Sequence, residues 1–256
     1  MNTIDTNGVV QTFRSIVLRT INGDFADNHL KLIGTYAFSG CSNLANVDLP
    51  LVTTINNYAF ASSGVTSINL PAAISIYIYA FSGCNNLTSV YLPATTTIGE
   101  YAFYNCSKLT SVDLPVATTI YGSTFRSCSK LTSVDSPVAT GVGDYAFLNC
   151  SALTIIELPE VTSIGGYALS GCTNLTSVEL PKVASIYNYA FQNCSSLTSV
   201  IISNTSRVAT LSGTDAFNGA DNAIIYVPDA LVSDYQSASN WSTYASRIKG
   251  LSELSE

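Results

Sequence analysis

The sequence contains little charge of either sign. Of its 256 residues only 11% are charged, with 17 acidic and 10 basic side chains and a formal net charge of -7. An acidic chain repels phosphate backbones and anionic lipid surfaces. We therefore expect neither nucleic acid nor a bare membrane surface to be its partner.

Long apolar runs are also missing. No stretch approaches the roughly 20 apolar residues that cross a bilayer as a helix, so we expect no membrane span. The first residues, Met1 to Asp5, lack the basic stretch and apolar core of a secretory signal. A cytoplasmic or phage-associated location therefore stays open beside a surface location that would require a removed leader.

The residue groupings of catalytic sites are absent as well. The sequence shows no Ser/His/Asp, Cys/His or phosphate-loop arrangement, and its single histidine, His29, lies outside the repeats described next. Carboxylates on an open strand face have nothing to shift their pKa values apart, as acid and base catalysis would require. We expect the protein not to be an enzyme and to need no cofactor.

What the sequence does contain is a repeat built around one apolar anchor residue. Successive anchors are separated by 22, 21, 22, 22, 22, 22, 22 and 26 residues. A fixed period of this size indicates one supersecondary unit stacked on copies of itself. The anchors are Phe38, Phe60, Phe81, Phe103, Phe125, Phe147, Leu169, Phe191 and Phe217.

The copy from Ile98 to Pro115 illustrates the unit. Its second half alternates polar and apolar side chains, with Val112 facing inward, which is the period of a half-buried strand that Pro115 then ends. In its first half, Phe103 and Cys106 fit one face of a short helical turn. Copies with one strand each must pair in parallel. The repeat predicts an α/β solenoid with a parallel sheet on one face and short helical turns on the other.

The consensus resembles a known family. Leu-x-x-Val-x-Leu-Pro followed by Ile-Gly-x-Tyr-Ala-Phe-x-x-Cys-x-x-Leu is similar to the bacterial BspA-type leucine-rich repeat, roughly over residues 33 to 228. The resemblance implies a right-handed, curved solenoid, often part of bacterial surface proteins that bind host proteins or extracellular matrix. It supplies no catalytic residues.

The repeat also sets the expected domain boundaries. We predict an N-terminal cap over 1–32, a leucine-rich repeat solenoid of about nine 22-residue units over 33–228, and a helical C-terminal cap over 229–256. Caps are expected because a bare solenoid end would leave an open core and an unpaired sheet edge. Trp241, the only tryptophan, is expected to pack inside the C-terminal cap.

Cysteine occupies a single position of the repeat, three residues after the anchor. The copies without it carry Ser63 and Ala220, so the position favours a small side chain. Parallel side chains in a column do not point at one another, which favours buried free thiols. A chain of disulfides and a metal site are the alternatives, but a tetrahedral zinc site needs converging ligands. The seven residues are Cys41, Cys84, Cys106, Cys128, Cys150, Cys172 and Cys194.

The outward residue between Val and Leu of each strand forms a second column, which we call the stripe. It consists of Asp48, Asn69, Tyr91, Asp113, Asp135, Glu157, Glu179 and Ile201. Four consecutive members are acidic, although like charges on adjacent strands cost about 0.2 to 1 kcal/mol each. We predict that Tyr91, Asp113, Asp135, Glu157 and Glu179 bind a protein partner, with a basic segment or a cation as the recognised group. A merely solvated strand face is the alternative.

Tyrosine recurs two residues before most anchors, and Ser123 replaces it once. Tyrosine is favoured at interfaces because its ring is apolar and its hydroxyl is polar. Each tyrosine adjoins an anchor, however, so packing along the outer side of the solenoid is the simpler interpretation.

The leading functional hypothesis is a non-enzymatic protein-binding scaffold, displayed at a bacterial cell surface for adhesion or host interaction. The alternative is a structural or assembly module, such as a phage-tail or intracellular scaffold component.

Overall fold

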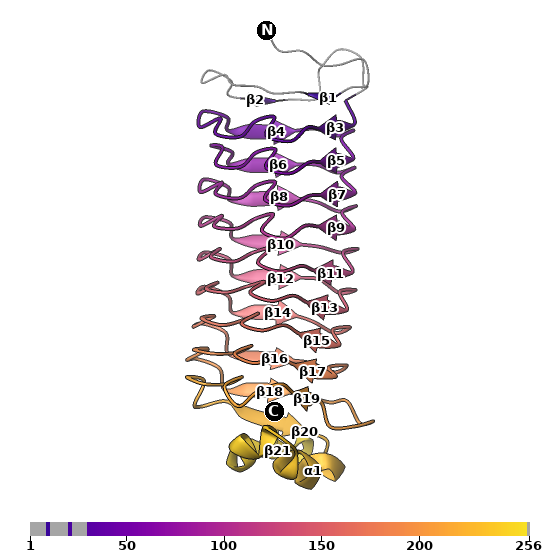
Figure 1. The fold of residues 1–256 in the computed structure, drawn as a ribbon, viewed down its shortest axis with the longest axis vertical. Coiled ribbons are helices and arrows are strands. Elements are labelled where there is room, and N and C mark those ends of the chain that lie inside the picture. The colour runs from indigo at the N-terminus through magenta and orange to yellow at the C-terminus, as the bar shows by residue number, and fades with distance from the viewer. Residues whose placement is uncertain (1–8, 11–19, 22–29, 255–256) are drawn as a thin grey trace.

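The computed structural model describes residues 9–10, 20–21 and 30–254. In these parts the chain winds into a stack of similar coils, and each coil contributes short strands to two rows of parallel strands, the main and the minor ladder (Figure 1). The predicted solenoid is therefore confirmed. Phe13 and His29, which belong to the predicted N-terminal cap, lie outside the described residues.

The main ladder is the parallel sheet expected from the Val-x-Leu pattern. Within each hydrogen-bonded group its strands pair in direct register, so that Val112 of one coil lies beside Val134 of the next. Each proline that follows ends its strand, as predicted. The strands are β2 (Thr20–Ile21), β4 (Asn46–Asp48), β6 (Ser67–Asn69), β8 (Ser89–Tyr91), β10 (Ser111–Asp113), β12 (Ser133–Asp135), β14 (Ile155–Glu157), β16 (Ser177–Glu179), β18 (Ser199–Ile201), β20 (Ile224–Val227) and β21 (Ile248–Gly250). These strands form three hydrogen-bonded groups, β2 to β8, β10 to β14 and β16 to β21, which follow one another along the stack.

A minor ladder, which the sequence analysis did not anticipate, follows each proline loop. Its two-residue strands place an isoleucine, valine or leucine in the core, as in Ile98 and Ile120. In the sequence, a Thr-Ile or Ser-Ile pair marks most of these strands. The strands are β1 (Val9–Val10), β3 (Leu32–Ile33), β5 (Thr54–Ile55), β7 (Ser75–Ile76), β9 (Thr97–Ile98), β11 (Thr119–Ile120), β13 (Gly141–Val142), β15 (Ser163–Ile164), β17 (Ser185–Ile186) and β19 (Thr210–Leu211).

The short helical turns predicted around the anchors take the form of consecutive tight turns. Backbone amides there alternate between two kinds of acceptor. The Phe103 N–H donates to the Thr124 carbonyl of the next coil at 2.9 Å, whereas the Cys106 N–H donates to the Phe103 carbonyl of its own coil at 3.2 Å. This alternation ties neighbouring coils together and satisfies buried backbone groups without an α-helix.

The anchors form the centre of the core. The phenylalanine anchors from Phe38 to Phe217 are at most 1% exposed. Neighbouring anchor rings stack with centroids 5.0 to 5.6 Å apart, and only Leu169 interrupts the stack. Such offset stacks are a favourable arrangement for aromatic side chains. One continuous apolar core therefore runs through all the described coils.

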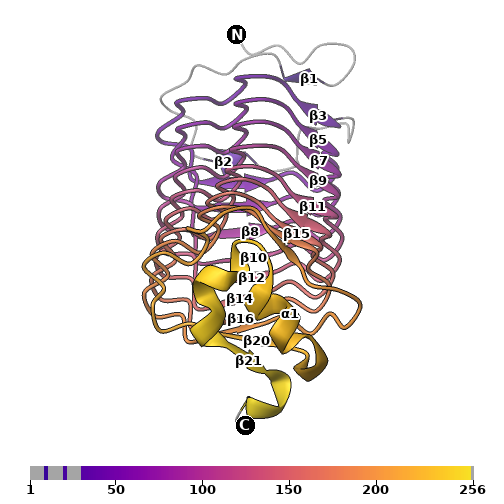
Figure 2. The same ribbon diagram turned by 60° about the horizontal axis from the view of Figure 1, so that its bottom comes forward.

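The C-terminal segment lies across the last coil (Figure 2). It consists of η1 (Asp229–Leu231), α1 (Val232–Ser237), η2 (Trp241–Arg247), β21 and η3 (Leu251–Glu253). Trp241 is 1% exposed, as expected for a packing residue. Ile248, which falls within the predicted helical cap, instead lies in β21 and pairs with Ile225 of β20.

At the other end, β1 pairs with β3 and β2 pairs with β4, both in parallel. Both ladders thus extend into the residues assigned to the N-terminal cap. The boundaries at residues 32 and 228 stay predictions.

Candidate functional site

The stripe lies along one exposed face of the main ladder. Asp113, Asp135 and Glu157 occupy equivalent positions in β10, β12 and β14, where they pair in direct register. All three are exposed, as are Tyr91 at the end of β8 and Glu179 at the end of β16. The structure thus aligns all five predicted site residues on one face.

The acidic part of the stripe takes part in no ion pair of the described residues. Residues 30–254 contain two ion pairs, Lys182 with Glu160 and Lys249 with Glu253, and neither involves the stripe. At the N-terminal end of the stripe, by contrast, the Asp48 carboxylate accepts a hydrogen bond from the Asn69 amide at 2.8 Å. The carboxylates of Asp113, Asp135, Glu157 and Glu179 therefore face solvent as one negative surface.

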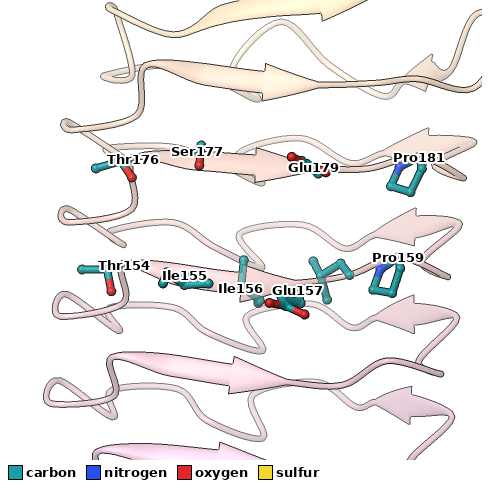
Figure 3. Close-up of a pocket in the computed structure, with 10 residues that line it drawn as sticks. Thr154, Ile155, Ile156, Glu157, Pro159, Thr176, Ser177, Glu179 and Pro181 are labelled. Atoms are coloured by element: carbon teal, nitrogen blue, oxygen red, sulfur yellow. The ribbon is translucent and has the colours of Figure 1, made fainter. Parts of the chain in front are cut away.

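Two open hollows interrupt this face. One, of about 350 Å³, spans β10, β12 and β14 and is lined by Ser111, Ser133 and the carboxylates beside them. The other, also about 350 Å³, lies between β14 and β16. In Figure 3 Glu157 and Glu179 lie one above the other on these two strands.

Ile155 lines both hollows and is 58% exposed. The equivalent positions of the neighbouring strands carry Ser133 and Ser177, so this isoleucine is an apolar ridge on an otherwise polar face. Ile155 was not among the predicted site residues. Its signal in the sequence is that it replaces the serine found at this position in the neighbouring strands.

The cysteine column is buried and reduced. All seven cysteines are buried thiols outside any disulfide. Burial raises the pKa of the Cys84 thiol to about 11 and that of the Cys194 thiol to about 12, because a thiolate would lose its hydration there.

The thiols also form hydrogen bonds, so the column does more than fill a small volume. Six of them donate to the carbonyl oxygen of the anchor in the preceding coil, with Sγ to O distances of 3.1 to 3.3 Å. Where serine replaces cysteine, the Ser63 hydroxyl lies 3.5 Å from the Cys84 sulfur. Within the described ranges no three His, Cys, Asp or Glu side chains are grouped to hold a metal ion.

The tyrosines form a ladder of their own on the anchor turns. Consecutive rings stack with centroids 4.5 to 5.1 Å apart. Their backbone is in the left-handed region, as in Tyr101 with a φ of 57°, which is uncommon for a bulky residue. Packing thus accounts for the column, although the tyrosines pack on one another rather than in the core.

A second left-handed position lies two residues after the anchor. It is occupied by Gly83, Asn105, Ser127 and similar small residues, with φ between 55° and 74°. Glycine and asparagine adopt this conformation readily. The recurrence of glycine, asparagine and serine at this position therefore indicates a tight turn in each coil.

Comparisons with known proteins agree with this architecture. The family model of the BspA type leucine rich repeat region matches residues 11–132 and 118–239. No curated protein matches the chain. Within the described residues, no helix is long and apolar enough to cross a membrane.

Solved structures of similar fold are bacterial leucine-rich repeat proteins. A leucine-rich repeat protein from Bacteroides ovatus shares 24% identity over 86% of this chain, with a TM-score of 0.61. One from Eubacterium ventriosum shares 17% identity over 83% of this chain and 88% of its own, with a TM-score of 0.50. The match covers 66% of the Bacteroides chain, so this protein spans slightly less than two thirds of that relative.

At these identities the likeness to solved structures concerns the fold alone, whereas the family model matches most of the sequence. Leucine-rich repeat scaffolds are typical of protein–protein interaction and are generally not enzymes. Given the matched segments and the stacked parallel coils, the chain belongs to the BspA-type leucine-rich repeat family.

Proposed function

We propose that this protein is a protein-binding scaffold of a bacterial cell surface and that its main-ladder face receives a basic segment of its partner. One observation carries the proposal. Asp113, Asp135, Glu157 and Glu179 lie on successive strands of one exposed face, and neither ion pair in residues 30–254 neutralises them. Complementary charge on a partner would relieve this repulsion and speed association.

The hollows suit long basic side chains. Lysine and arginine carry an apolar stem and a charged end. The stem can pack on Ile155, which lines both hollows, while the charged end reaches Glu157, which lines them as well. Tyr91, which is 57% exposed, supplies an aromatic contact at the other end of the acidic run.

A binding experiment with a defined probe tests the partner chemistry. Fluorescence anisotropy with a labelled hexalysine peptide is expected to show saturable binding that weakens as salt is added. The double variant Asp135→Lys and Glu157→Lys should lower the affinity at least about tenfold, because each removed contact also becomes a repulsion.

The matched control makes the same charge change elsewhere. Asp221 and Asp234 are exposed and lie outside the stripe, so Asp221→Lys with Asp234→Lys alters the net charge equally. This control should keep the affinity within about threefold, the range expected from long-range charge alone. An equal loss in both double variants would assign the binding to net charge and reject the stripe.

The surface location is supported by the family resemblance and has its own test. Antibody labelling of intact cells of the source bacterium should detect the protein, and protease added to those cells should remove the signal. Labelling only after lysis would instead favour the intracellular or assembly role.

A further inference from the structure

The repeat departs from itself in the coil that carries Phe125. Here Ser123 takes the tyrosine position, which interrupts the tyrosine ladder between Tyr101 and Tyr145. In the same coil Arg126 follows the anchor, where most other coils carry a smaller side chain such as Ser82 or Ser170. A missing ring and an added guanidinium thus occur three residues apart.

Arg126 lies between one ring of the tyrosine ladder and one ring outside it. Its guanidinium carbon lies 5.7 Å from the ring centroid of Tyr145, which belongs to the ladder, and 5.8 Å from that of Tyr104, which follows the anchor Phe103. Ser123 is only 2% exposed. Both ring distances are within the range of cation–π attraction, so the guanidinium is held between two aromatic faces.

The charge of Arg126 has no acidic partner in residues 30–254, since both ion pairs there involve lysines. Its Nε atom is buried without a hydrogen-bond partner, whereas its two Nη atoms are not among the buried unpaired groups and donate to no described acceptor. The terminal end of the guanidinium therefore reaches solvent with its donors free. Arg247 differs, because one of its Nη atoms donates to the Ala220 carbonyl at 2.7 Å.

We propose that Arg126, Tyr104 and Tyr145 form a subsite for a carboxylate group of a protein partner. A guanidinium presents paired donors that match the two oxygens of a carboxylate. The two rings hold it in place before binding, which reduces the ordering that association would otherwise require. Arginine and tyrosine are also the residues that most often dominate binding at protein interfaces.

This subsite is separate from the stripe. Arg126 lies on an anchor turn, whereas the stripe lies on the strands of the main ladder. The subsite also has the opposite charge preference, so it does not depend on the proposed function. A partner with an acidic segment would bind to the tyrosine ladder at the point where Ser123 interrupts it.

The test uses the full chain labelled with nitrogen-15 at arginine and carbon-13 at the tyrosine rings, with acetate as the probe, so that the rings also report binding in a variant that lacks Arg126. Acetate is titrated against chloride at constant ionic strength while the side-chain N–H signals are followed by NMR. The Arg126 signal should shift and saturate at millimolar acetate, together with the ring signals of Tyr104 and Tyr145. Arg207, which is exposed and outside the tyrosine ladder, serves as the internal control and should not saturate.

Two variants separate charge from geometry. Arg126→Lys keeps the charge but loses the planar pair of donors, so acetate affinity should fall at least about fivefold. Ser123→Tyr restores the missing ring and should displace the guanidinium, which abolishes saturation although the arginine is still present. Tyrosine is tolerated at this left-handed position in neighbouring coils, so this variant is expected to fold.

Two results would overturn the subsite. One is that the side-chain signals of Arg126 and Arg207 respond alike to acetate, and the other is that the Arg126 signal still saturates in Ser123→Tyr. Saturation by inorganic phosphate at a lower concentration than by acetate would overturn its assignment to carboxylates.

Discussion

The Cys106 thiol donates a hydrogen bond to the carbonyl oxygen of Phe81 in the preceding coil, with 3.2 Å between the sulfur and oxygen atoms. The same bond recurs from coil to coil and links the cysteine column to the anchor column. Burial and a regular partner together explain why cysteine occupies this position without disulfide formation. The first two predictions follow from this arrangement.

Thiol accessibility is the direct test of the column. Because all seven thiols are buried, a thiol reagent should react slowly with the native protein, in which the thiolate form is suppressed. After denaturation it should react rapidly with seven groups. A rapidly reacting thiol under native conditions would show that part of the column is open.

The stability of the fold should fall at alkaline pH. The folded-state pKa of Cys84 is about 11 and that of Cys194 about 12, whereas an unfolded cysteine titrates near about 8.5. Below about pH 8.5 both states keep the proton and the stability is fully present. Above it the unfolded state loses protons first, so each thiol can lower the free energy of unfolding by up to about 1.4 kcal/mol per pH unit.

Urea unfolding between pH 8 and 11 measures this effect. Tyrosines with raised pKa values, such as Tyr235, add to the slope, so Cys84→Ala provides the comparison that isolates a thiol. That variant should lose stability less steeply as the pH rises. Identical slopes would mean that Cys84 titrates alike in both states.

Ser136 is a defect in the core that substitution should repair. It is fully buried and its hydroxyl has no hydrogen-bond partner in the described structure. The neighbouring coils carry Leu114 and Leu158 at the same position. Ser136→Ala removes an unsatisfied polar group and should raise the free energy of unfolding by about 1 kcal/mol. Ser136→Leu also completes the apolar column and should add about 2 kcal/mol if its full side chain fits.

Chemical denaturation of both variants, with Ser133→Ala on the same strand as the control, checks this expectation. Ser133 is partly exposed, so its substitution should change the stability little. A lower stability for Ser136→Ala would indicate that the hydroxyl has a favourable partner after all.

Trp241 should be essential to the C-terminal end of the core. Its indole N–H donates to the Ala209 carbonyl at 2.6 Å, and its ring contacts those of Phe217 and Tyr235. Trp241→Ala should cost about 3 to 5 kcal/mol, as for other large buried aromatic residues, and should lower the melting temperature. Trp241→Phe keeps part of the packing and should cost less. An unchanged melting temperature for Trp241→Ala would reject this role.

Much of the fold could be predicted from the sequence because the same apolar, proline and anchor positions recur in nearly every copy of the repeat. Val112 and Leu114 mark an inward strand face, Pro115 its end, and Phe103 the core anchor, and all four interpretations agree with the structure. The minor ladder was missed because a two-residue strand is too short to show a period. The cap was predicted to be helical at Ile248, but this residue pairs as a strand with Ile225, which lies 23 residues earlier in the chain. Local spacing does not reveal such a pairing.

The candidate site was predictable only as a column. Alternation along each strand was sufficient to identify Asp113, Asp135 and Glu157 as outward and adjacent. The ridge formed by Ile155 depends on the small size of Ser133 and Ser177 on either side, so it becomes visible only when the coils are stacked.

The sequence by itself determined the period, the parallel solenoid and the identity of its inward columns, because every coil repeats the same burial pattern. Only the tertiary structure decided how unlike residues of neighbouring coils complement one another. It placed the Arg126 guanidinium between the rings of Tyr104 and Tyr145. It also directed six of the seven thiols to the anchor carbonyl one coil earlier. These contacts join residues that are 19 to 25 positions apart in the chain but adjacent along the solenoid, and stacking distance rather than sequence distance governs them.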